Sequence, residues 1–204
     1  MSVEIFNCEQ GTDEWAALRA GVPTASEFSS ILAKGEGKTR AAYLRRLAAE
    51  IVTGEPLETF KSAAMERGHV QEDAARRAYA LLEDVEPERV GFMFNNGVGY
   101  SPDSLIGAAG LLEIKTQRAD LLIETWKADR FPPEHVPQCQ GGLWVAEREW
   151  IDLVIYAPRM PVFVRRAYRN AAYIADLARA VEIFREELAA LVETVRRYGT
   201  SEAA

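Results

Sequence analysis

The chain has 204 residues, of which 48% are hydrophobic and 27% are charged. This length and composition suit one compact domain with a sizeable core, and they exclude a disordered or fibrous chain. The 24 Lys and Arg residues and 31 Asp and Glu residues give a formal net charge of −7, which argues against a protein that coats nucleic acid by neutralising its phosphates. A nuclease is not excluded, because it gathers carboxylates around metal ions and needs only a locally basic track.

Two further features bound the class of protein. The two cysteines, Cys8 and Cys139, are too few for a disulfide framework, a four-cysteine zinc site or a four-thiolate iron–sulfur cluster. The chain has no run of about eighteen apolar residues, and its start, Met-Ser-Val-Glu, lacks the basic and apolar parts of a signal peptide. We therefore expect a cytoplasmic protein with no membrane partner, folded as a single domain over residues 1–204.

Hydrophobic periodicity predicts the elements in chain order. The predicted helices cover residues 12–34 with a break at 21–23, then 39–52, 62–82, 136–147 and the amphipathic C-terminal range 174–198. The predicted strands cover residues 90–94, 99–101, 110–115, 150–157 and 162–168. This order predicts an α/β fold with a mixed central sheet flanked by helices.

The most informative stretch is Ser101-Pro102-Asp103, followed after nine residues by Glu113-Ile114-Lys115. Glycines at 107 and 110 allow a turn that brings Glu113 beside Asp103, and Glu113 and Lys115 share one face of a strand because they are two residues apart. Such a carboxylate pair suits a hard cation such as Mg²⁺, with the Ile114 carbonyl as a third oxygen donor and Lys115 placed to orient a water. The pattern therefore predicts metal-assisted phosphodiester hydrolysis.

Each of these residues also has a simpler interpretation. The strand could be an edge strand with exposed charges, although Leu111, Leu112 and Ile114 make it apolar and favour a functional reason for its polar residues. Glu72, on the predicted helix 62–82, could reach the metal site or pair with Arg76 at the i+4 position. The two histidines, at 69 and 135, lie in no metal-ligand spacing.

At this point the chain resembles the lambda-exonuclease family of phage recombination nucleases, the YqaJ-like branch of the PD-(D/E)XK superfamily. Five blocks between residues 10 and 160 carry the resemblance in the family's order. The blocks are Gln10-Gly11 with Trp15, Leu18-Arg19-Ala20-Gly21 and Thr24-Ala25-Ser26; Gly68 to Glu72; Ser101-Pro102-Asp103 with Glu113-Ile114-Lys115; Pro137-Gln138-Cys139-Gln140 with Leu143-Trp144-Val145; and Tyr156-Ala157-Pro158-Arg159-Met160.

The resemblance implies a restriction-endonuclease-like core and a deoxyribonuclease. Members of the family are Mg²⁺-dependent exonucleases that processively digest one strand of linear double-stranded DNA from its 5′ end, leaving a 3′ single strand for phage-type recombination by strand annealing. Carried over by position, Asp103, Glu113 and the Ile114 carbonyl become metal ligands, and Lys115 becomes the residue that orients the attacking water. Glu72 becomes a catalytic helix carboxylate that contacts the metal or its water.

The resemblance also groups residues that in the family hold the 5′-terminal phosphate: Arg19, Ser26, Ser101 and Gln138. A guanidinium, two hydroxyls and an amide all donate hydrogen bonds to phosphate oxygens, and a phosphate can be held without reading base sequence. Local alternatives remain: Arg19 as a surface residue, Ser26 as a helix N-cap, Ser101 as a turn residue and Gln138 as a helix-start amide.

Further DNA contacts are less well defined. The basic residue that the family carries some six positions beyond its active-site lysine falls here on Leu121, whereas Arg118 lies closer to Lys115. Arg118 and Gln140 are therefore candidate DNA contacts. The basic loop 34–40, with Lys34, Lys38 and Arg40, could line a DNA entrance or simply be solvated.

The expected mechanism uses two Mg²⁺ ions per active site, with Mn²⁺ able to substitute. By resemblance, we expect a homotrimeric ring around the DNA, a single-strand annealing protein as partner and a phage or prophage origin. The main rival function is an end-independent PD-(D/E)XK endonuclease, because the fold and catalytic triplet are shared across that superfamily. A non-enzymatic DNA-binding protein is disfavoured by the intact triplet, and an iron–sulfur nuclease is excluded by the cysteine count.

Overall fold

The computed structural model describes the backbone of residues 3–33, 37–57 and 63–200, and the side chains of these ranges except for 63–70 and 199–200. The helices are α1 (Asp13–Arg19), α2 (Phe28–Leu32), α3 (Lys38–Thr53), α4 (Ala63–Glu83), α5 (Ala119–Ala128), α6 (Val136–Ala146) and α7 (Ala171–Thr200), with 3₁₀ turns η1 (Ala25–Glu27) and η2 (Pro133–His135). The strands are β1 (Glu4–Phe6), β2 (Phe92–Asn95), β3 (Val98–Tyr100), β4 (Ser104–Ile106), β5 (Gly110–Thr116), β6 (Trp150–Tyr156) and β7 (Phe163–Tyr168). Lys34, Ser62 and the side chain of His69 lie outside the described residues.

Local sequence signals explain where several helices begin and end. Thr12 caps α1: its Oγ1 accepts a hydrogen bond from the Trp15 backbone N–H at 3.3 Å, and two acidic residues occupy the first turn. The long α3 ends at Gly54, which adopts a left-handed conformation with φ of 75°. The break predicted at residues 21–23 is present, and it separates α1 from η1 and α2.

The strands form two sheets. The smaller is antiparallel with the order β1-β2-β3, and the larger has the order β4-β5-β6-β7. In the larger sheet β5 and β6 are parallel, whereas the β4–β5 and β6–β7 pairs are antiparallel. The predicted mixed sheet flanked by helices is thus confirmed, with the difference that β1 and β4 are additional strands of three residues each.

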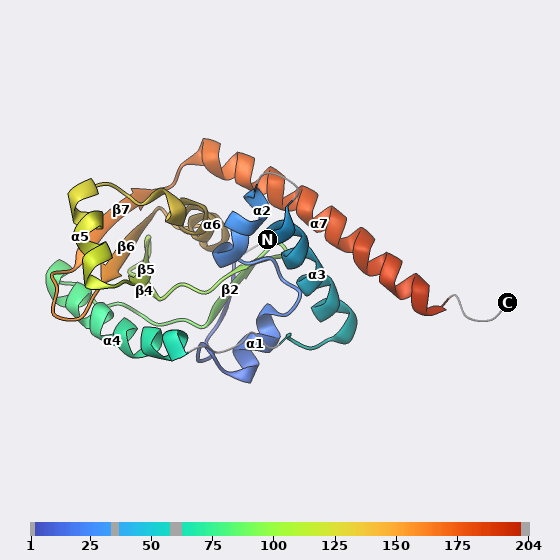
Figure 1. Ribbon diagram of the computed structural model, residues 1–204, viewed down its shortest axis with the longest axis horizontal. Helices are drawn as coiled ribbons and strands as arrows, with labels where there is room; N and C mark the ends of the chain where they lie inside the picture. Colours follow the sequence, from blue (N-terminus) through green and yellow to red (C-terminus); the bar gives the residue numbers. More distant parts are fainter. Residues whose placement is uncertain (1–2, 34–36, 58–62, 201–204) are drawn as a thin grey trace.

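The larger sheet has a helix layer on each face (Figure 1). Alternate residues of a strand point to opposite faces, so Leu111 of β5 joins the core that includes α6, whereas Leu112 and Ile114 pack with Ala75 and Tyr79 of α4. The sheet therefore separates α4 from α6. The carboxylates of β5 and of α4 can meet only around the edge formed by β4.

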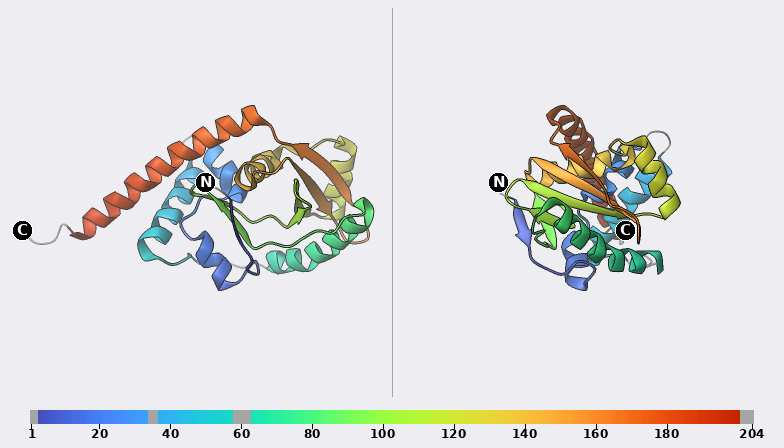
Figure 2. Two further views of the ribbon diagram at one scale, coloured as in Figure 1. Left: turned by 180° about the vertical axis from the view of Figure 1, so that it is seen from behind. Right: turned by 90° about the vertical axis from the view of Figure 1, so that its left-hand side faces the viewer.

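The C-terminal helix α7 packs across the N-terminal helices. Its apolar stripe contains Leu177, Val181, Phe184 and Leu188, all buried, and the Phe184 ring stacks on Tyr43 of α3 with centroids 5.4 Å apart. The far end of α7 reaches beyond the rest of the molecule (Figures 1 and 2). Among the helices that the structure describes, none is both long and apolar enough to span a bilayer.

Candidate active site

Asp103 and Glu113 lie side by side at the β4–β5 hairpin. Ser104 pairs with Leu112, and the Asp103 N–H donates to the Leu112 carbonyl at 3.1 Å. The turn passes through Gly107, whose φ of 54° favours glycine. The Asp103 carboxylate in turn accepts a 2.5 Å hydrogen bond from the Ile114 N–H. Asp103 is therefore fixed to the backbone of the strand that carries Glu113.

Glu113 is the buried centre of the cluster, with 3% of the residue exposed. Its Oε1 accepts hydrogen bonds from Lys115 Nζ at 2.8 Å and from Gln138 Nε2 at 2.6 Å, and its Oε2 accepts one from the Tyr100 hydroxyl at 2.8 Å. Lys115 points to the same face as Glu113, as their two-residue spacing predicts. Three elements thus converge on one carboxylate: β3 through Tyr100, β5 through Lys115 and α6 through Gln138.

Negative charge dominates the electrostatics of this cluster. Burial, followed by repulsion from Glu113 and Glu72, raises the pKa of Asp103 well above its usual value. Burial and the nearby Glu113 likewise raise the pKa of Tyr100. Burial opposes the charge on Lys115, but attraction to Glu113 and their hydrogen bond outweigh it, so the Lys115 pKa is raised. Lys115 pairs with Glu113 and Arg76 pairs with Glu72, and a bound cation would further relieve the repulsion that Asp103 meets from these two carboxylates.

The donor set fits a hard cation such as Mg²⁺. Within the residues that the structure describes, no three His, Cys, Asp or Glu side chains are arranged to hold a metal ion. Mg²⁺, however, is commonly held by one or two carboxylates and keeps several waters. Asp103, Glu113 and the Ile114 carbonyl offer oxygen donors of this kind, provided that the two carboxylates turn from their present partners.

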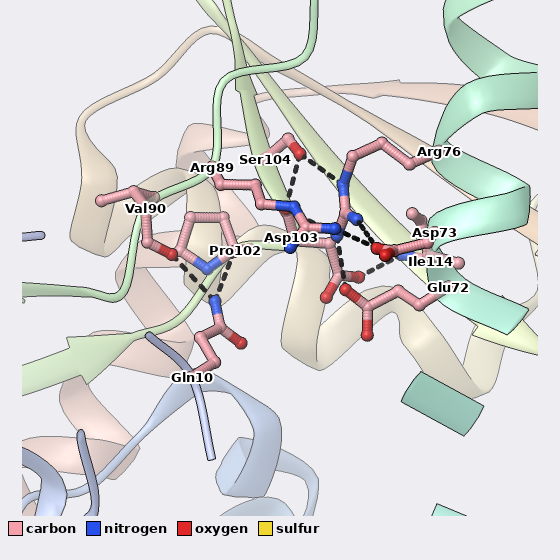
Figure 3. Close-up of polar contacts among 10 residues, drawn as sticks. All are labelled: Gln10, Glu72, Asp73, Arg76, Arg89, Val90, Pro102, Asp103, Ser104 and Ile114. Carbon is pink, nitrogen blue, oxygen red and sulfur yellow. Dashed lines mark hydrogen bonds and ion pairs between the residues drawn. The ribbon is translucent and has the colours of Figure 1, made fainter. Parts of the chain in front are cut away.

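Glu72 reaches the cluster from α4, on the other side of the sheet. It forms an ion pair with Arg76, and Arg76 Nη2 also donates to the main-chain carbonyl of Asp103 at 3.2 Å (Figure 3). Repulsion from Glu72 contributes to the raised pKa of Asp103. The pairing of Glu72 with Arg76, one of the two interpretations that the sequence allows, is therefore present, and Glu72 also lies close enough to Asp103 to repel its charge.

Two of the four residues grouped as a phosphate site meet at Ser101. Ser101 Oγ accepts hydrogen bonds from Arg19 Nη1 at 3.1 Å and from Trp15 Nε1 at 2.9 Å, and the Arg19 guanidinium lies 4.2 Å from the centroid of the Trp15 ring. The sequence analysis assigns Trp15 no site role. Its i, i+4 spacing from Arg19 on a predicted helix nevertheless indicates that the two side chains can be in contact.

The other two residues of this group have different hydrogen-bond partners. Ser26 is exposed, with its hydroxyl 3.2 Å from Thr24 Oγ1, and the Thr24–Gly99 bridge places this segment beside β3. Gln138 donates a hydrogen bond to the carboxylate of Glu113 on β5. The structure thus places Gln138 with the carboxylates.

The candidate DNA contacts differ in how available their side chains are. Gln140 is buried: its amide donates to the Tyr168 carbonyl at 3.0 Å and accepts from the Asn170 N–H at 2.9 Å. Arg118 is exposed at the start of α5 and pairs with Asp120 at 2.8 Å. Arg40, predicted in a basic loop, lies in α3 instead and pairs with Glu187 of α7 at 2.6 Å. Of these three side chains, Arg118 is the exposed one.

The fold and this carboxylate arrangement define a nuclease of the PD-(D/E)XK type. Comparison with family models matches residues 14–149 to the YqaJ-like viral recombinase domain. The chain belongs to that family, and it is a deoxyribonuclease. The family generally uses a divalent metal. The family and fold expected from the sequence are thereby confirmed.

Solved structures agree with this assignment. The chain is 34% identical to LHK-Exo crystallised with dAMP, with a TM-score of 0.87 over 94% of this chain and 100% of the other. A second crystal structure of this alkaline exonuclease, from Laribacter hongkongensis, gives 33% identity and a TM-score of 0.85 over the same shares. A phage-related exonuclease from Haemophilus somnus, 13% identical with a TM-score of 0.65 over 88% and 99% of the chains, shows the shared fold alone. Comparison with curated protein sequences gives no match.

Proposed function

We propose that the chain is a Mg²⁺-dependent exonuclease that digests one strand of linear duplex DNA processively from its 5′ end. It releases mononucleotides and leaves a 3′ single strand for recombination by annealing. The observation that carries this proposal is the short segment Ser101-Pro102-Asp103, which joins the Arg19–Ser101 contact to the carboxylate cluster. Two residues span at most roughly 7 Å of chain. A terminal phosphate held at Ser101 would therefore place the next phosphodiester beside Asp103.

In this mechanism Asp103, Glu113 and the Ile114 carbonyl would hold Mg²⁺, with Glu72 as a further ligand. Two bound Mg²⁺ ions, or Mn²⁺ in their place, would supply an activated water and stabilise the leaving oxygen. Lys115 orients the water, and its positive charge opposes the negative charge that develops on the phosphate. Tyr100 and Gln138 hold Glu113 in the metal-free site through their hydrogen bonds, and the Glu113 carboxylate would turn from these partners as Mg²⁺ binds.

Arg19, Ser101 and Ser26 form the proposed terminal-phosphate pocket, and Gln138 extends it toward Glu113. The hydrogen bond from Arg19 goes to a neutral hydroxyl, so an anionic ligand would add a charge interaction there. LHK-Exo has been crystallised with dAMP, a nucleoside monophosphate of the kind that this reaction would release. Arg118 is the remaining candidate for contact with the duplex.

We expect Arg19→Ala to impair digestion of 5′-phosphorylated duplex far more than digestion of 5′-hydroxyl duplex. Loss of a charge-assisted hydrogen bond costs about 1.5–3 kcal/mol, equivalent to roughly 10- to 150-fold. The measurement compares kcat/KM on the two substrates. Arg179→Ala, which removes an exposed arginine of α7, serves as the matched control. Equal losses on both substrates would remove Arg19 from the phosphate pocket.

The polarity is tested on a duplex with one 5′-phosphate and a distinct label at each 3′ end. Digestion from the phosphorylated 5′ end should progressively shorten the labelled fragments of that strand and leave its complement at full length. Early release of either 3′ label as a mononucleotide would show the opposite polarity.

The assembly and the setting are proposed from the resemblance to the family. We propose a homotrimeric ring, because a closed ring keeps an enzyme on DNA without tight binding at any single contact. We also propose a single-strand annealing protein as partner and the cytoplasm of a phage-bearing bacterium as location. Sedimentation of the purified chain would show a single species of three subunits; a stable monomer would remove the ring as the source of processivity.

A further inference from the structure

The Arg76 side chain links α4 to the start of β4 at Asp103. The residue is 8% exposed. Its Nε donates to Ser104 Oγ at 3.0 Å, its Nη1 to Asp73 at 2.7 Å, and its Nη2 to Glu72 and to the Asp103 carbonyl (Figure 3). All three nitrogens of the guanidinium therefore have acceptors. Two acceptors are carboxylates of α4, and the other two are the Ser104 hydroxyl and the Asp103 carbonyl at the start of β4.

Burial distinguishes this contact from an ordinary helix ion pair. A solvated i, i+4 pair contributes little to stability and needs no burial. Removing a guanidinium from water is costly unless its hydrogen bonds are made in full and in good geometry. The planar fork of arginine presents five N–H donors in fixed directions from three nitrogens, whereas lysine presents three donors from a single nitrogen.

We propose that Arg76 is a positioning residue that holds the Glu72 carboxylate against Asp103 before the metal binds. The inference rests on the proposed role of Glu72 as a metal ligand. Glu72 comes from a helix on the opposite face of the sheet from Glu113, so its place at the site depends on how α4 is fixed to the β4 edge. Arg76 also supplies positive charge among the neighbouring carboxylates, and this lets Glu72 and Asp103 stay close without a metal.

The same sheet offers a matched control. Arg166 of β7 makes a bidentate ion pair with Asp152 of β6, at 2.7 and 2.8 Å, on the face that α4 covers. Asp152 is 1% exposed and also accepts a hydrogen bond from Tyr79 of α4 at 2.6 Å. This second guanidinium stabilises the same helix layer without touching Glu72 or Asp103.

The test is a Mn²⁺ titration of the full chain without DNA, in which electron paramagnetic resonance reports free Mn²⁺. Arg76→Lys should raise the dissociation constant about tenfold, the usual lower effect of losing a residue that orients a metal ligand. Arg166→Lys should lower the Tm and leave the Mn²⁺ dissociation constant unchanged. If Arg76→Lys does not fold, Ser104→Ala removes the Nε partner and should weaken Mn²⁺ binding in the same direction.

A double-substitution cycle separates the inference from the function on which it rests. Glu72→Gln alone should weaken Mn²⁺ binding, and adding Arg76→Lys should then have no further effect on it. Unchanged binding in Glu72→Gln would contradict the proposed metal role of Glu72. If Glu72→Gln weakens Mn²⁺ binding but Arg76→Lys leaves it unchanged or tightens it, the positioning role is overturned. Tighter binding in Arg76→Lys would mean that Arg76 competes with the metal for Glu72.

Discussion

Lys115→Ala is expected to lower the rate of strand cleavage about 10³-fold while binding of DNA ends stays close to that of the unaltered chain. Loss of a group that stabilises developing charge typically costs about 10²–10³ in rate, and in the proposed mechanism Lys115 acts on both the water and the phosphate. The Lys115–Glu113 contact of 2.8 Å is also lost, but Tyr100 and Gln138 still donate to Glu113. The site should therefore keep its shape.

The measurement combines single-turnover cleavage in Mg²⁺ with anisotropy titration of a labelled duplex end in Ca²⁺. Lys127→Ala, at an exposed position of α5, is the control for loss of a lysine. Full activity of Lys115→Ala would refute its proposed role. A parallel loss of cleavage and binding would make Lys115 a DNA-binding residue.

Asp103→Asn is expected to reduce cleavage by at least about 10³-fold, because it removes a proposed metal ligand, and a bound metal ion supplies several kcal/mol of transition-state stabilisation. The same substitution should stabilise the metal-free protein at neutral and alkaline pH. The pKa of Asp103 is raised in the folded state, mainly by burial. The folded chain thus holds this proton more tightly than the unfolded chain does, and its stability falls as the pH rises through the raised pKa.

Thermal unfolding in EDTA between about pH 5 and pH 9 tests whether stability falls with rising pH. An unfolded aspartate titrates near pH 3.9, so over this range it is already ionised in the unfolded chain. The unaltered chain should lose Tm with rising pH, and Asp103→Asn should lose less over the same range. Added Mg²⁺ should restore the Tm of the unaltered chain at high pH and leave that of Asp103→Asn unchanged. Parallel Tm curves in EDTA would show that the Asp103 charge is not a source of instability.

The sequence predicts the parts of this site that depend on short-range geometry. The adjacency of Asp103 and Glu113 follows from a glycine-bearing turn between two strands, and the alignment of Glu113 with Lys115 follows from strand periodicity. The long helices α3 and α7 follow from apolar periodicity in the same way. Three-residue strands such as β1 and β4 are too short for a period-two pattern to stand out.

Local sequence patterns do not predict contacts between distant segments, and only the family resemblance groups Arg19 with Ser101. Tyr100 and Gln138 reach Glu113 from 13 and 25 residues away, and Trp15 reaches Ser101 across 86 residues. Arg76 is the clearest example, because the i, i+4 spacing of Glu72 and Arg76 in the sequence is the same whether the ion pair is solvated or buried. Its burial depends on how α4 meets the β4 edge, which is a property of tertiary packing.

The most direct test of the proposed activity is digestion of a linear 5′-phosphorylated duplex and of a covalently closed circle, each with Mg²⁺ and with EDTA. We expect mononucleotides from the phosphorylated strand in Mg²⁺, an intact circle and no reaction in EDTA. Cleavage of the circle would instead show an endonuclease on this fold and leave the phosphate pocket at Arg19 and Ser101 without a function. Undiminished digestion in EDTA would contradict the metal-dependent mechanism at Asp103 and Glu113.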